Sequence, residues 1–139
     1  MSDPSYMRKF DYIINFHREA DVRIPAHLDQ IRLVMEGVSR LGPYNSPRFP
    51  QKSGGVGWFC NVCGATPSKR TEIARRLMKH IKVDSYGRCL HTADFPKGLK
   101  PSMANKRLML ERYHFDFAFE NAIEESWITE KVFHGLASG

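Results

Sequence analysis

The stretch Tyr113-His-Phe-Asp-Phe-Ala-Phe-Glu-Asn-Ala-Ile-Glu-Glu-Ser-Trp-Ile-Thr-Glu-Lys131 decides how the rest of this chain is interpreted. Phe115, Phe117 and Phe119 alternate with smaller or polar residues, which is typical of a strand with one strongly apolar face, and we expect all three in the core. Ser126 is a favourable helix N-cap. Apolar residues recur behind it at helical spacing: Ile128, Val132 and Leu136. The stretch therefore predicts a strand, a polar turn and a helix.

The polar residues Glu120 and Asn121 follow this strand at its carboxyl end. Open α/β sheets bind ligands where a strand ends and a helix begins. The free amides and the dipole of the helix N-terminus favour anions at such a place. The stretch therefore also predicts an anion-binding crevice.

Composition fits one globular domain of 139 residues, of which 42% are hydrophobic. No apolar run approaches the roughly 20 residues that span a membrane, and residues 1–8 lack the apolar region of a signal peptide. We therefore expect a soluble chain. The net charge of +6 suits an anionic partner such as a sugar nucleotide, a nucleic acid or an acidic membrane, although charged helix faces in solvent explain much of it equally well.

Strands and helices alternate from Val56 onward. Residues 56–63 and 82–84 predict strands that precede the one at Phe115, and residues 101–113 predict a helix with Leu108 and Met109 facing inward. The helix after the first strand is predicted to have Thr66 as its N-cap and Pro67 at its first position. Its expected core stripe is Ile73, Leu77, Met78 and Ile81. This order predicts the α/β class, with a Rossmann-like parallel sheet covered by helices on both faces.

The first 55 residues are less informative. Residues 10–16 predict a strand, and residues 27–35 a short helix. Residues 42–50 and 53–55 are rich in glycine and proline and predict loops. We expect His17 and His27 to be structural or exposed to solvent.

Three motifs resemble the α1,3-fucosyltransferase family, glycosyltransferase family 10. Phe119-Glu-Asn-x5-Trp-Ile-Thr-Glu-Lys131 is similar to the family's donor-binding signature, with Ala122, Ser126 and Trp127 standing where the family usually has Ser, Asp and Tyr. Residues 83–89 resemble its VDSYGxC stretch, and residues 61–65 its NCGA stretch, which Val62 interrupts. Residues 17–25 match a further segment in weaker form, so the resemblance covers nearly the whole chain.

The resemblance implies the donor-binding half of a two-domain GT-B glycosyltransferase. Residues 1–55 would end the acceptor-side region and form a variable linker, and residues 56–139 would form the GDP-fucose-binding region, truncated at its C-terminus. The implied reaction transfers fucose from GDP-fucose to a glycan hydroxyl in α1,3 linkage, with inversion and without a required cofactor. A glycan or glycoprotein acceptor, no nucleic acid, and a place in the Golgi lumen are also implied, with membrane attachment through a segment that this chain lacks.

The same resemblance assigns donor-binding roles to five residues. Arg70 and Lys131 would hold the diphosphate, Glu130 would accept hydrogen bonds from ribose or fucose hydroxyls, Asn121 would bind nucleotide or sugar, and Trp127 would offer an aromatic face. Fixed cations beside a departing diphosphate favour the transition state. The general base would be a carboxylate of the acceptor domain, and we expect it outside this chain, so the catalytic residue stays unknown.

The cysteines allow two other interpretations. Cys60, Cys63, Cys89 and His91 could form a small zinc-binding module, which is the main alternative function. In an oxidising lumen Cys63 and Cys89 could instead form a disulfide, because the two motifs that hold them end neighbouring strands.

A basic nucleic-acid-binding module is a further alternative. Its residues would be Lys69, Arg70, Arg75, Arg76, Lys79 and Lys82.

Overall fold

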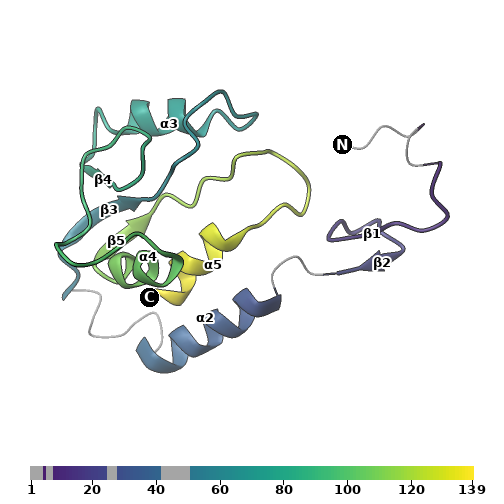
Figure 1. Ribbon diagram of the computed structural model, residues 1–139, viewed down its shortest axis with the longest axis horizontal. Coiled ribbons are helices and arrows are strands. Elements are labelled where there is room, and N and C mark those ends of the chain that lie inside the picture. Colours follow the sequence, from purple (N-terminus) through teal and green to yellow (C-terminus); the bar gives the residue numbers. More distant parts are fainter. Residues whose placement is uncertain (1–4, 6–7, 25–27, 42–50) are drawn as a thin grey trace.

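The computed structural model describes residue 5 and residues 8–24, 28–41 and 51–139 (Figure 1). His27 lies outside the described residues. The elements, in chain order, are β1 (Ile14–Asn15), β2 (Val22–Arg23), α2 (Leu28–Leu41), β3 (Gly54–Trp58), α3 (Arg70–Leu77), β4 (Val83–Ser85), α4 (Met103–Leu110), β5 (Tyr113–Asp116) and α5 (Glu130–Ala137). No helix in this described part is both long and apolar enough to cross a membrane.

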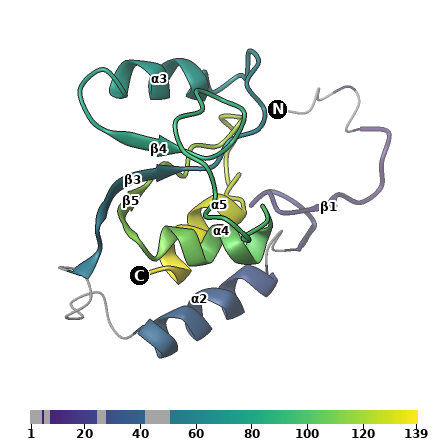
Figure 2. The same cartoon turned by 60° about the vertical axis from the view of Figure 1, so that its left-hand side comes forward.

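Three parallel strands form the main sheet, in the order β4-β3-β5. Val56 in the central strand pairs with Val83 on one side and with Phe115 on the other. Figure 2 shows α3 over one face of this sheet and α4 and α5 over the other. The predicted α/β class, with a Rossmann-like parallel sheet and helices on both faces, is confirmed.

A small core lies between β3, β4 and α3. Trp58 is 2% exposed and Ala74 is fully buried, and Val56, Val83 and Cys89 are buried beside them. Phe117 and Phe119 stack on each other with centroids 4.8 Å apart and pack against this cluster. The prediction that these two phenylalanines belong to the core is confirmed.

Several predicted inward faces are wrong. Phe115 is 64% exposed, Leu108 is 52% exposed and Ile73 is 44% exposed, and Ile81 is exposed as well. A sheet of three strands covers only a narrow stripe of each helix, so α3 places Ala74 and Thr71 against it and turns Ile73 outward. Met109 is buried as expected, next to Leu110.

Two predicted helix starts are wrong as well. Lys69 is the N-cap of α3, in a left-handed conformation, so Thr66 and Pro67 belong to the preceding turn. Helix α5 begins after Thr129, and Ser126 lies in the preceding loop with φ 62°. Strand β3 ends at Trp58, earlier than predicted, and the next residues form a loop.

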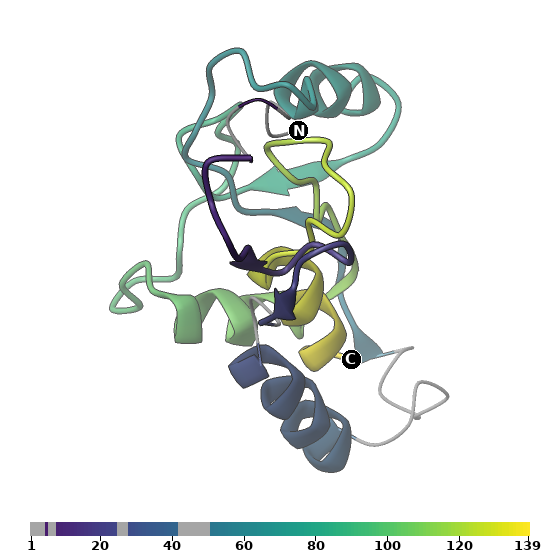
Figure 3. The same ribbon diagram turned by 90° about the vertical axis from the view of Figure 1, so that its right-hand side faces the viewer.

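The N-terminal part of the chain packs against the C-terminal loop and helix. Helix α2 runs beside α5 (Figure 3), and a Cβ atom on Gly37 would collide with the Ala137 backbone. Strands β1 and β2 are parallel and short, and Asp21 closes their connection by accepting a hydrogen bond from the Ile13 amide at 2.9 Å. Phe16 then contacts Trp127, with ring centroids 5.1 Å apart.

Candidate functional site

The candidate site lies where β3 and β5 end. The chain leaves β3 toward α3 and leaves β5 toward α5, and these helices cover opposite faces of the sheet. Such a divergence of two connections at the carboxyl ends of parallel strands is the usual ligand position in open α/β sheets. Arg70 lies at the start of α3, on the first connection. Glu120 and Lys131 lie on the second, after β5 and at the start of α5.

Arg70, the first residue of α3, joins the two connections. Its guanidinium donates to the Phe119 carbonyl after β5 and to the Val62 carbonyl after β3, both at 3.3 Å. The residue is 5% exposed, and its Nε has no hydrogen-bond partner within the described residues. Both observed partners are neutral carbonyls, and no carboxylate pairs with Arg70 within the same residues. A buried guanidinium without a paired anion is suited to an anionic ligand.

Four residues around the start of α5 form a hydrogen-bonded cluster, which we call the clasp: Glu120, Thr129, Glu130 and Lys131. The Glu120 carboxylate accepts from the Thr129 amide at 2.8 Å and from the Thr129 hydroxyl at 2.7 Å. It also accepts from Lys131 Nζ at 3.0 Å, and Lys131 reaches the Glu130 carboxylate at 3.2 Å. The clasp thus joins the stretch that follows β5 to the first turn of α5.

Electrostatics agree with this arrangement. Burial alone would raise the pKa of Glu130, but the charge and hydrogen bond of Lys131 outweigh it and lower that pKa. Glu130 is therefore an ionised hydrogen-bond acceptor at neutral pH.

Three further ionisable residues have pKa values that burial shifts: Asp116, Lys106 and His134. Burial raises the pKa of Asp116 to about 6, against the attraction of the Lys106 ammonium. Burial, together with the charge of Lys106, lowers the pKa of His134 to about 4. The pKa of Lys106 is itself lowered by burial, although Asp116 and Glu130 oppose this. The charge of Lys106 is thus coupled to Glu120, Glu130 and Lys131 of the clasp.

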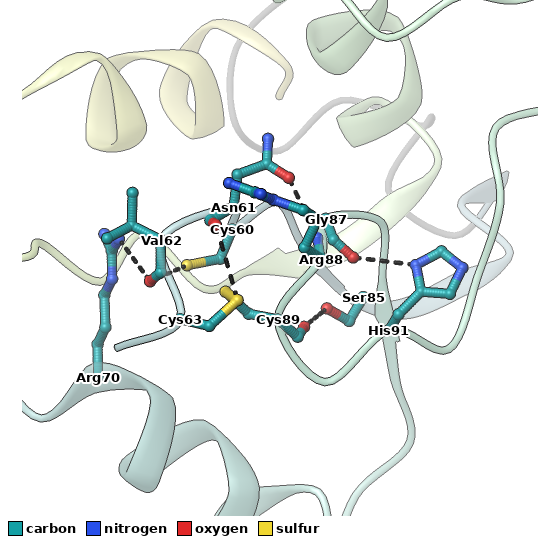
Figure 4. Close-up of a disulfide and its surroundings, with 10 residues drawn as sticks. All are labelled: Cys60, Asn61, Val62, Cys63, Arg70, Ser85, Gly87, Arg88, Cys89 and His91. Carbon is teal, nitrogen blue, oxygen red and sulfur yellow. Dashed lines mark hydrogen bonds between the residues drawn. A yellow bond between two sulfur atoms is a disulfide. The ribbon is translucent and has the colours of Figure 1, made fainter. Parts of the chain in front are cut away.

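A disulfide fixes the connection that follows β3. Cys63 and Cys89 are bonded, with Cα atoms 5.0 Å apart (Figure 4). Cys60 is buried, and its thiol points to the Val62 carbonyl at 3.5 Å, the same carbonyl that accepts from Arg70. The hypothesis that Cys63 pairs with Cys89 is confirmed, and the bond holds the loop that anchors Arg70.

The zinc alternative is not supported, because this disulfide joins two of its four ligands. The remaining two bind elsewhere: Cys60 faces Val62, and His91 contacts the Gly87 carbonyl at 2.9 Å and Asp94. Among the described residues, no group of three or more His, Cys, Asp or Glu side chains could hold a metal.

The sequence matches a known family over most of its length. The family model described as "Glycosyltransferase family 10 (fucosyltransferase) C-term" matches residues 49–139. The chain belongs to glycosyltransferase family 10.

Several similar proteins share a name that is more specific than the family description. The chain is 46% identical over 136 residues to GDP-fucose protein O-fucosyltransferase 3 of Danio rerio, covering 94% of this chain and 30% of the relative. The proteins of the same name from Gallus gallus (48% over 81 residues, 55% of this chain and 17% of the relative) and Homo sapiens (31% over 134 residues, 94% and 28%) are also similar. The chain therefore spans less than a third of the length of these relatives. No solved structure matches it.

In the structure, the five residues with predicted donor-binding roles fall into two groups. Arg70, Glu130 and Lys131 lie on the two connections at the sheet edge, and Asn121 lies beside them with an exposed side chain. The Asn121 carbonyl accepts from the Ser68 amide at 3.5 Å, which ties the loop to the turn before α3.

Trp127, the fifth of these family positions, lies instead at a separate cleft of about 490 Å³ formed with the β1–β2 segment. Its partners there include Phe16. Its indole Nε1 is buried and has no hydrogen-bond partner among the residues described.

Glu120, Thr129 and Lys106 were assigned no individual donor-binding role in the sequence-based interpretation of this fucosyltransferase-family chain. Glu120 could have been identified, because it is the first carboxylate at the carboxyl end of the predicted strand and belongs to the family signature. Lys106 carries no such signal, since it lies in a helix whose inward face was predicted from apolar residues alone. Arg70 turns inward, away from the exposed basic residues of the nucleic-acid alternative, such as Arg75 and Arg76.

Proposed function

We propose that this chain forms the donor-binding part of a GT-B fucosyltransferase and binds GDP-fucose at the site around Arg70 and the clasp. The observation that carries the proposal is the buried Arg70 guanidinium, which joins both connections and meets only neutral carbonyls in the described residues. The names of the related proteins, which include GDP-fucose, support the same donor.

The chain's residues suit the charge that develops during fucosyl transfer. As the bond to fucose breaks with inversion, negative charge grows on the departing diphosphate, and Arg70 can hold two of its oxygens with a planar fork. Lys131 adds a fixed positive charge at the first turn of α5. Side chains that stabilise this growing charge more than the ground state accelerate the reaction. No metal enters this account.

Glu130 and Asn121 are proposed to bind hydroxyl groups of the ribose or fucose. Glu130 is ionised and half-buried beside Lys131, so it can accept hydrogen bonds, and the Asn121 amide can donate and accept. Trp127 would face the sugar or the acceptor from the separate cleft. The general base is proposed to belong to the acceptor side of the enzyme.

The acceptor is proposed to be a protein hydroxyl, because the similar proteins are named protein O-fucosyltransferases. The α1,3 transfer to a glycan is the second candidate, and the Thr129-Glu-Lys131 motif favours it. The disulfide supports a lumenal place in the secretory pathway, such as the Golgi, because such bonds persist in oxidising compartments.

Calorimetric titration with GDP and with GDP-fucose tests the donor. We expect saturable binding that Lys131→Ala weakens at least tenfold, or by about 1.4 kcal/mol. A folded chain that binds neither ligand would contradict the proposal. Transfer from labelled GDP-fucose by the full-length enzyme to an unglycosylated protein, compared with transfer to a free oligosaccharide, separates the two acceptor classes.

A further inference from the structure

We infer that Glu120 is a positioning residue of the donor site, acting on the ligand through Lys131. The inference rests on the proposed function and adds a residue to it. Glu120 follows the β5 segment, and its side chain is 14% exposed, against 20% for Lys131. Its two carboxylate oxygens accept from three groups: the Thr129 amide, the Thr129 hydroxyl and Lys131 Nζ.

The protons of the clasp have one consistent arrangement. An ammonium has three donors, and Lys131 Nζ has three acceptors: Glu120 at 3.0 Å, Thr129 Oγ1 at 2.6 Å and Glu130 at 3.2 Å. A hydroxyl has one proton, so Thr129 accepts from Lys131 and donates to Glu120. Every donor of the ammonium is therefore used, and its position is fixed from three directions.

This order matters because a lysine side chain is flexible. Burying and fixing it costs up to about 2 kcal/mol of rotamer entropy. In the clasp Lys131 is already held before any ligand arrives, so a diphosphate would meet a charge at a set position. Preorganisation of this kind raises affinity by removing an ordering cost from the binding step.

Glu120 also determines where α5 begins. Thr129 is the N-cap of this helix, but its hydroxyl makes no capping hydrogen bond, because it is turned toward Glu120. The carboxylate holds the Thr129 amide as well, which closes the loop 121–128 at its base. Glu120 therefore links the end of the β5 segment to the helix that carries Glu130 and Lys131.

Positioning and simple electrostatics predict opposite effects for Glu120. A carboxylate near a diphosphate repels it, so Coulomb interactions alone predict tighter GDP binding after Glu120→Gln. If Glu120 holds Lys131 in place, the same substitution weakens GDP binding. The direction of the change therefore separates the two explanations.

A double-mutant cycle tests the inference on the 139-residue chain, with GDP as the probe. The variants are Glu120→Gln, Lys131→Met and both together, measured by calorimetry. We expect Glu120→Gln to weaken GDP binding about tenfold in the wild-type background and less than about twofold beside Lys131→Met, since residues acting through each other are not additive. A merely structural role for Glu120 would produce the same loss in both backgrounds.

Controls keep the outcomes distinct. Glu72→Gln makes the same chemical change at an exposed carboxylate that pairs with Arg76, and we expect GDP affinity to stay within about twofold, as is usual for surface positions. If Glu120→Gln does not fold, Thr129→Val removes the bridging hydroxyl and takes its place in the cycle.

The outcomes distinguish failure of the inference from failure of the proposed function. Equal losses in both backgrounds, or tighter binding by Glu120→Gln, overturn the role of Glu120 while the donor site stands. A folded wild-type chain that does not bind GDP overturns the proposed function, and the inference with it.

Discussion

The Tyr113 hydroxyl donates a hydrogen bond to the Asp84 carboxylate at 2.8 Å, although the two residues belong to opposite edge strands of the sheet. The tyrosine ring crosses the central strand over Gly54 and Gly57, where side chains would collide with it or crowd it. Tyr86 completes the link, because its hydroxyl lies 2.5 Å from that of Tyr113. Burial, reinforced by these two partners, raises the pKa of Tyr113, so the link stays protonated at neutral pH.

Replacing Gly54 by alanine should disrupt this crossing. The added methyl group would collide with the Tyr113 ring, and overpacking of this kind costs about 1–3 kcal/mol. Urea unfolding of Gly54→Ala measures the loss. Gly64→Ala is the matched control, because among the described residues no atom beyond its two chain neighbours lies within 4 Å of its Cβ position. Equal stability of the two variants would contradict the role of the tyrosine.

Thiol counting should find one free cysteine in the denatured chain before reduction and three after it. Cys63 and Cys89 are bonded, which leaves Cys60 free. Reduction should also lower the free energy of unfolding by about 3 kcal/mol, because the bond constrains the unfolded chain. Three thiols without a reductant would contradict the pairing.

Arg70→Lys should lower the affinity for GDP at least tenfold, although the charge is kept. A lysine can supply a charge at this place, but it cannot donate to the Phe119 and Val62 carbonyls and to a diphosphate with one planar group. Arg75→Lys makes the same exchange at an exposed position of the same helix and should have no effect. Equal losses in both variants would instead indicate general electrostatic attraction.

Asp116 and His134 should have opposite effects on stability as pH changes. Asp116 has its pKa raised from 3.8 to about 6, so its contribution to stability falls as pH rises through this window. His134 has its pKa lowered from 6.5 to about 4, so its contribution rises with pH over nearly the same window. The wild-type chain should therefore show little net slope from these two groups.

Single substitutions should reveal each slope. Between pH 6.5 and pH 4.5, Asp116→Asn should lose stability on acidification, by about 2 kcal/mol, and His134→Gln should gain it. Urea unfolding at several pH values measures both. Parallel curves for the two variants would show that these groups titrate normally.

The sequence allowed the order of elements to be predicted because alternation along the chain is a local property. The parallel sheet follows from strands separated by helices, and the place of Arg70 and Lys131 follows from where those strands end. Which face of an element is covered depends on distant packing, and so Phe115 and Ile73 were predicted on the wrong side. The start of α5 was missed because Glu120, nine residues earlier, binds Thr129. A prediction that uses only the adjoining residues of the sequence favours Ser126 as the N-cap.

The close approach of α2 to α5 at Gly37 and Ala137 has a consequence for shortened forms of this protein. A chain that begins at residue 49, where the family match begins, would lack α2 and leave the outer side of α5 facing water. Leu136 on that helix is already 57% exposed, so the uncovered area would grow into an adhesive apolar surface. Solubility during expression should therefore depend on retaining α2.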